Sequence, residues 1–175
     1  MDSSICRLLK NYHNSRKSWE AWCFLDNIDL EEDNQKIKDL TDNNQFLKLT
    51  RYLFLKDLHI ELYKILKNSR SSEDNLIKLL KNKNTKESRS HLRKFILFKP
   101  EINSTLNARD KFYAHLDSDY ESYLKGFDVR IYNDIFVLIE QGIIILGYEK
   151  ELINTLKNIP SRDEYKSITK DIFNF

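Results

Sequence analysis

The sequence is poor in the residues that interrupt or cross-link a chain. Its 175 residues include three glycines, two prolines and two cysteines. Sheets with many strands and parallel α/β folds need glycine and proline at their turns, so this composition favours helices. Cys6 and Cys23 fall on one predicted helix, at a spacing that fits neither a disulfide framework nor a CxxC metal or redox site. We therefore expect an all-α protein in a reducing cytoplasm.

The sequence also lacks a hydrophobic run that is long enough to cross a membrane. The most apolar stretch, residues 135–146, is interrupted by Glu140, Gln141 and Gly142, and it is shorter than the roughly 20 residues that a membrane span requires. No basic segment followed by an apolar one opens the chain, as it would in a secretory signal. With 41% hydrophobic residues, the chain can bury one core. We expect a soluble cytoplasmic protein with a single domain over residues 1–175 and no membrane partner.

Several motifs of catalysis and cofactor binding are missing. Three isolated glycines cannot form a GxGxxG motif or a P-loop, and the sequence contains no GxSxG elbow or HExxH pair. His13, His59 and His91 fall on separate predicted helices, and none has a second ligand three or four residues away. We therefore expect neither a cofactor nor a metal site, and we interpret these histidines as helix-surface or partly buried side chains.

Charge is distributed unevenly, although the chain carries a formal charge of only +2. The segment 78–99 contains eight Lys or Arg residues and a single acid, Glu87, so it carries +7 and the rest of the chain −5. Such a block is typical of a solvated face or of a flexible connection. It is also typical of a surface that binds polyanions, because clustered cations gain affinity by releasing phosphate counterions.

Apolar residues recur every three or four positions along most of the chain, which predicts a bundle of helices. The helix expected in the middle carries apolar residues on two faces, so it should be central. Asp29 and Glu32 can form a capping box before a short polar helix. Pro100 marks either a kink or, as we favour, the first turn of a later helix. The helix expected in the middle covers residues 43–66, and the other main helices are expected over residues 4–25, 86–98 and 128–157.

Capping and turn residues mark further boundaries. Ser71 and Ser72 start a short helix ahead of the basic one. Asp128 can cap the long apolar helix, in which Gly142 and Gly147 allow close packing or a bend. A short helix closes the chain.

An arginine occupies an apolar position on the helix that follows the basic one. Ile102, Leu106, Tyr113 and Leu116 are spaced as a core stripe, and residue 109 completes it. That residue is Arg109, and a guanidinium cannot lose its proton. A buried arginine therefore needs either a carboxylate partner in the core or an opening onto a cleft that holds an anion. Both alternatives fit the pattern.

His115 follows Arg109 on the same predicted helix. Asn107, Lys111 and His115 succeed one another at intervals of four residues and form a polar ridge, in which the lysine favours the neutral imidazole. On an ideal helix, Arg109 and His115 are about 120° apart around the axis and about 9 Å apart along it. They meet at one phosphate only through the reach of the arginine, a helix break near Ala114, or the pairing of two copies of the motif.

Arg109, five intervening residues and His115 fit the signature R-x(4 to 6)-H, within the segment ARDKFYAHLD at residues 108–117. This segment resembles the HEPN superfamily, most closely its AbiU-type abortive-infection branch. The resemblance is good over residues 105–118, and the helical order over residues 43–157 is compatible with it. It implies a HEPN-like helical bundle, with a four-helix core and extra short helices.

The resemblance also implies an activity, that of a metal-independent endoribonuclease acting as a toxin or antiphage effector. Its two motifs would share one cleft in a homodimer, and a cognate antitoxin is a further partner that it allows. Arg109 would bind the scissile phosphate and stabilise charge in the transition state. His115 would take the proton of the ribose 2′-OH or deliver one to the 5′-oxygen. Cleavage would leave a 2′,3′-cyclic phosphate and would require RNA.

Neighbouring residues receive roles in RNA binding from the same resemblance. Lys111 is a second phosphate contact, Asn107 and Asp110 flank the arginine, and Tyr113 either stacks on a base or, more simply, belongs to the core. Asp110 departs from the neutral polar residue of many relatives, and as an acid it would repel a phosphate. Asp117 stands where one antitoxin-paired branch has a tyrosine, so regulation by nucleotidylation is not implied. The basic segment is the expected RNA platform, with Arg89, Arg93 and Lys94 as substrate-binding residues.

Two other functions fit these residues. A HEPN-like module without catalysis would bind nucleic acid or a protein and would keep its affinity after His115→Ala, whereas a nuclease would lose turnover. A helical adaptor without a nucleic-acid role would retain RNA equally well after lysines between residues 78 and 94 are neutralised.

Overall fold

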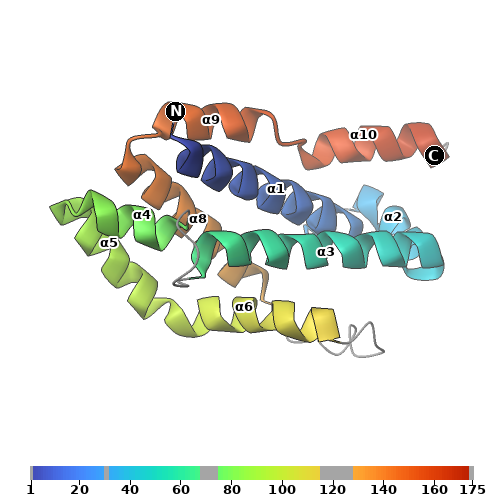
Figure 1. The fold of residues 1–175 in the computed structure, drawn as a ribbon. Coiled ribbons are helices and arrows are strands. Elements are labelled where there is room, and N and C mark those ends of the chain that lie inside the picture. The colour runs from blue at the N-terminus through green and yellow to red at the C-terminus, as the bar shows by residue number, and fades with distance from the viewer. Residues whose placement is uncertain (1, 30–31, 68–74, 115–127, 174–175) are drawn as a thin grey trace.

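The computed structural model describes residues 2–29, 32–67, 75–114 and 128–173, which form helices and contain no strand (Figure 1). The predicted all-α bundle is confirmed. The helices are α1 (Ser3–Leu25), α2 (Glu32–Asn43), α3 (Gln45–Leu66), α4 (Leu76–Lys83), α5 (Lys86–Leu97), α6 (Lys99–Ala114), α8 (Val129–Leu146), α9 (Glu149–Lys157) and α10 (Arg162–Phe173). In the described ranges, no helix combines the length and the apolar character needed to cross a membrane.

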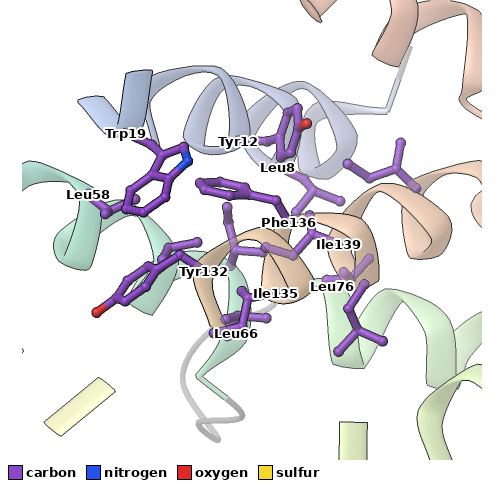
Figure 2. Close-up of a cluster of buried hydrophobic side chains, with 14 of the residues drawn as sticks. Leu8, Tyr12, Trp19, Leu58, Leu66, Leu76, Tyr132, Ile135, Phe136 and Ile139 are labelled. Carbon is purple, nitrogen blue, oxygen red and sulfur yellow. The ribbon is translucent and has the colours of Figure 1, made fainter. Parts of the chain in front are cut away.

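The core lies where α1, α3 and α8 meet. Figure 2 shows Tyr12 and Trp19 of α1 directed toward Phe136 of α8, with Leu58 of α3 beside them. The ring of Trp19 stacks on that of Tyr132, with centroids 5.2 Å apart. Each large side chain that is fully buried contributes roughly 1.5–3 kcal/mol to folding. This aromatic cluster therefore fixes how α8 lies against the first half of the chain.

The helix α3 is central, as predicted, because it packs against α1, α2, α4 and α6. Its core face buries Leu55 and Leu58 completely. The second predicted apolar face begins with Phe46, Leu49 and Leu53, and these residues are not buried. Phe46 is 73% exposed, and Leu49 and Leu53 are about half exposed. The pattern of two apolar faces therefore predicted burial wrongly at the N-terminal end of α3.

Side-chain caps determine where several helices begin. The side chain of Asp128 accepts a hydrogen bond from the backbone N–H of Arg130 at 3.0 Å and starts α8, as predicted. The side chain of Asn75 accepts one from the N–H of Lys78 at 2.9 Å and starts α4. The start of α4 therefore lies later than predicted, and Ser71 and Ser72 fall outside the described residues.

The long apolar helix predicted to reach residue 157 is two helices. Gly147 has φ 98°, ends α8 in the left-handed conformation, and lets α9 begin at Glu149. A residue without a Cβ adopts this conformation at little steric cost, which is why glycine commonly ends helices. Gly142 serves the other predicted purpose, close packing, because a Cβ there would lie 3.0 Å from Cδ2 of Leu76 on α4.

Charged side chains hold the peripheral helix α2 to the bundle. Arg51 on α3 is buried, and its Nη1 lies 3.0 Å from a carboxylate oxygen of Asp26 and 2.8 Å from one of Asp42. Asp26 follows α1 and Asp42 belongs to α2, so one guanidinium joins three segments.

A second arginine holds α10 against α1. The Nε of Arg162 donates to a carboxylate oxygen of Glu20 at 2.9 Å, and its Nη1 donates to Asp29. Asp29 was predicted to form a capping box with Glu32. The carboxylate of Asp29 pairs with Arg162 of α10, and the side chain of Glu32 lies outside the described residues, so the capping box stays a prediction.

Candidate functional site

The helix α6 carries the predicted motif, and its backbone is described as far as Ala114. Pro100 lies in its first turn, as predicted. Ile102 is buried and Leu106 is half-buried, so the first two positions of the predicted core stripe face the bundle. The rest of the motif lies outside the described part of the chain: the side chains of Arg109, Asp110, Lys111 and Tyr113, and all of His115.

A cavity of about 540 Å³ opens between α3, α4, α5 and α6. In Figure 1, α6 runs below the central helix α3, and α4 and α5 lie at the left of the view. Asn107, the one predicted site residue of α6 whose side chain is described, is exposed and lines this cavity. The cavity therefore lies beside the end of α6 that leads into the motif.

Three lysines line the same cavity. Lys67 follows α3, Lys81 lies on α4 and Lys99 begins α6, and all three are exposed. Lys81 and Lys99 belong to the basic segment 78–99. Lys67 lies outside that segment and was not predicted to belong to the site. One signal was available, because Lys67 follows Tyr63 by four residues, and its Nζ lies 4.2 Å from the centroid of that ring.

The three residues of α5 that were predicted to bind substrate lie outside the described lining of this cavity. Arg89 folds back, and its Nη1 donates to the backbone oxygen and to the side-chain oxygen of Asn84, at 3.1 and 3.0 Å. Lys94 donates to Oε1 of Gln141 on α8 at 3.1 Å, and Arg93 is exposed. None of the three is among the described residues that line the cavity with Asn107. Lys81 and Lys99 of the basic segment therefore line the cavity, whereas the three predicted substrate-binding residues of α5 are not in its described lining.

Two histidines are buried, so their interpretation as surface or partly buried side chains was wrong. Nδ1 of His59 lies 2.7 Å from the backbone oxygen of Leu55, and Nε2 lies 2.7 Å from the hydroxyl of Tyr132. Nε2 of His91 lies 2.9 Å from the backbone oxygen of Leu138. Burial lowers the pKa of His59 to about 4, and burial also lowers the pKa of His91. Both rings are neutral at pH 7 and join helices.

Other reactive groups among the described residues are structural as well. Burial raises the pKa of the Cys23 thiol. Burial, followed by the hydrogen bond that Tyr12 donates to Glu140, raises the pKa of the Tyr12 phenol. Both groups therefore stay protonated at neutral pH. No cluster of three or more His, Cys, Asp or Glu side chains in the described ranges could hold a metal ion.

Comparison with protein families, with curated proteins and with solved structures finds no match for this chain. The resemblance to the HEPN superfamily therefore stays a prediction from the motif at residues 108–117.

Proposed function

We propose that the protein is a metal-independent endoribonuclease with a HEPN-like fold that acts as a toxin or antiphage effector. The observation that carries the proposal is the sequence of Arg109, five further residues and His115, in a chain whose described part is an all-helical bundle. Arginine binds phosphate through paired, charge-assisted hydrogen bonds. Histidine has an ordinary pKa near neutrality and can transfer protons at physiological pH. The two residue types together suit phosphodiester cleavage.

The proposed reaction needs no reactant other than RNA, because the RNA supplies both the nucleophile and the leaving group. His115 accepts the proton of a ribose 2′-OH while the 2′-oxygen attacks the adjacent phosphorus. The bond from phosphorus to the 5′-oxygen breaks, and that oxygen receives the proton from the protonated His115. Arg109 binds the non-bridging oxygens and stabilises their developing charge. The products are a 2′,3′-cyclic phosphate and a 5′-hydroxyl, and no metal is required.

The described surroundings of α6 support a polyanionic substrate. Asn107 is exposed on α6, and the exposed lysines Lys81 and Lys99 line the adjacent cavity. Cations beside a cleft raise the local concentration of phosphate groups and speed their association. The basic segment thus has a role in this function, although its arginines Arg89 and Arg93 do not line that cavity.

A homodimer completes the proposed site. On a continuous ideal helix, Arg109 and His115 would stand about 120° apart, and the pairing of two copies is the arrangement that we propose to bring them to one phosphate. Two copies related by a two-fold axis bring the arginine of one toward the histidine of the other. If the proposed site is shared in this way, a mixture of Arg109→Ala and His115→Ala proteins regains cleavage that neither protein has alone.

The proposal is tested by incubating purified protein with total RNA in EDTA. We expect the wild-type protein to cut RNA and the Arg109→Ala and His115→Ala variants to be inactive. Arg130→Ala and His13→Ala are matched controls, because Arg130 is exposed and pairs only locally with Asp128 among the described acids. Cutting that persists in both motif variants places the chemistry elsewhere. If the wild-type protein does not cut RNA, and the wild-type and His115→Ala proteins bind RNA with equal affinity, the result favours the binding module without catalysis.

A further inference from the structure

The cavity between α3, α4, α5 and α6 combines an apolar interior with a cationic rim. Its walls include buried Phe95 and Ile102 and half-buried Ile77, Leu92 and Leu106. The exposed lysines Lys67, Lys81 and Lys99 line it from three different helices or helix ends. Among the described lining residues there is no acid. The charged side chains in the described lining are therefore all positive, and they border an apolar surface.

The size of the cavity matches that of a ligand site. Its volume is about 540 Å³, and pockets that bind small molecules typically measure roughly 300–1,000 Å³. Helical cores otherwise pack without voids much larger than a water molecule. Small-molecule sites combine a mainly apolar lining with a few placed polar groups, which is the composition of this cavity.

We propose that this cavity binds a single-chain anionic amphiphile, with the alkyl chain against the apolar wall and the anionic headgroup at the three lysines. Lysine ammonium groups act as compact point charges that suit a carboxylate or a phosphate headgroup. An alkyl chain has no polar edge that needs a partner inside the apolar part. The inference goes beyond the proposed nuclease and does not rest on it.

The lining disfavours a nucleobase as the occupant. A base that enters the cavity buries several hydrogen-bonding groups, and each such group costs free energy when it has no partner. The uncharged polar side chains in the described lining are Asn103 and Asn107, both exposed and on α6, and Tyr63, which is half-buried on α3. The aliphatic wall of Ile77, Leu92 and Ile102 offers no partner. RNA phosphates can approach the lysines from outside, but an alkyl chain fits the interior better.

The cavity is close in the sequence to the motif of Arg109 and His115. Asn107 lines the cavity, and Arg109 follows it by two residues on α6. An amphiphile bound there would contact the helix that carries the arginine, so the cavity is a place where a small molecule can act on that helix.

The proposal is tested with dodecyl phosphate, below its micelle concentration, by isothermal titration calorimetry on the full chain. We expect saturable binding of one molecule per chain. The triple variant Lys67→Met, Lys81→Met, Lys99→Met should bind at least about tenfold more weakly, a loss of about 1.4 kcal/mol. The matched control changes Lys10, Lys150 and Lys157 to Met, three exposed lysines away from the cavity, and should bind as the wild type does.

A second variant tests the apolar wall. Leu106→Gln places an amide at a half-buried position of the lining, and should weaken dodecyl phosphate binding while circular dichroism and thermal unfolding show a folded protein. Dodecanol should bind more weakly than dodecyl phosphate, and inorganic phosphate should not bind at this concentration.

Four results would overturn the proposal. The first is the absence of saturable binding of dodecyl phosphate, and the second is equal binding of dodecyl phosphate by the two triple variants. The third is an affinity for inorganic phosphate equal to that for dodecyl phosphate. The fourth is that the protein binds only to vesicles of phosphatidylglycerol and phosphatidylcholine. The last result would identify a membrane-surface site that uses the exposed Ile96 and Leu97, which are 69% and 77% exposed. Loss of RNA cleavage in the Arg109→Ala variant has no bearing on any of these results.

Discussion

The Nε2 atom of His59 on α3 lies 2.7 Å from the hydroxyl oxygen of Tyr132 on α8. The other ring nitrogen, Nδ1, lies 2.7 Å from the backbone oxygen of Leu55, which can only accept a hydrogen. Nδ1 therefore carries the hydrogen, and Nε2 accepts one from the tyrosine. Because Trp19 stacks on Tyr132, this polar pair lies inside the aromatic core. Burial lowers the pKa of His59 and thereby keeps its ring neutral at pH 7.

Acidification should destabilise the protein through His59. Burial lowers its pKa to about 4 in the folded state, whereas an unfolded chain has a histidine pKa of about 6.5. Between these pH values the unfolded state binds more protons, so the free energy of unfolding falls as the pH is lowered from about 6.5 to about 4, by up to ~3 kcal/mol.

Urea unfolding at a series of pH values checks this prediction. His59→Gln cannot titrate, so it should be less stable than the wild type at pH 7 and should depend less on pH below 6.5. His13→Gln is the control and should keep the wild-type slope. His91 adds a slope of the same sign, because burial also lowers its pKa. An unchanged slope in His59→Gln would contradict the assignment of the acid sensitivity to His59.

Gly142→Ala should destabilise the contact between α8 and α4. The added Cβ would lie 3.0 Å from Cδ2 and 3.1 Å from Cδ1 of Leu76, and 3.3 Å from Nε2 of His91. Leu76 is fully buried and has little room to move, so we expect a loss of about 1–3 kcal/mol from overpacking. Thermal unfolding measures it. Adding Leu76→Val should recover part of the loss, and a variant more stable than the wild type would show that the core adapts.

Gly147→Ala should destabilise for a different reason. A Cβ there would have space, since the nearest side-chain atom is Nζ of Lys83 at 3.7 Å, but φ is 98°. A left-handed backbone costs an L-residue roughly 1–2 kcal/mol. Asparagine tolerates this conformation better, so Gly147→Asn should lose less stability than Gly147→Ala in the same thermal unfolding experiment. Equal stability of all three proteins would mean that the end of α8 does not depend on this conformation.

Arg162→Gln should release α10 from the bundle. Arg162 donates to Glu20 and to Asp29, and its side chain is only 28% exposed. Hydrogen bonds between charged groups in partly buried places contribute on the order of 1–2 kcal/mol. Hydrogen–deuterium exchange should therefore increase in residues 162–173 and stay unchanged in α3. Arg130→Gln, which removes an exposed local pair with Asp128, should leave exchange in α10 unaltered.

Local signals in the sequence predicted the helical class and some of its boundaries. Asp128 starts α8 because a cap acts on the backbone two residues away. Gly142 and Gly147 looked alike in the sequence, yet one packs against Leu76 and the other ends the helix. The roles of these two glycines depend on contacts between distant segments, which local sequence patterns do not show. The prediction of one helix over residues 128–157 was therefore wrong.

The candidate site was less predictable than the fold. The burial of His59 and His91 depends on Tyr132 and Leu138, which are distant in the sequence. Lys67 joins the cavity only because α3, α4 and α6 come together there. The pairing of Arg109 with His115 stays a prediction, as the side chain of the first and all of the second lie outside the described residues.

The central claim is that Arg109 and His115 act together on the ribose 2′-OH of RNA. The most direct measurement is the initial rate of cleavage, in EDTA, of an RNA oligonucleotide and of the same oligonucleotide with 2′-deoxyribose at the cut position. We predict that wild-type protein cuts only the ribose form, leaves a 2′,3′-cyclic phosphate, and is at least about 100-fold faster than Arg109→Ala or His115→Ala. Cleavage of the deoxy form, 5′-phosphate ends, or unchanged rates in both variants would contradict the claim.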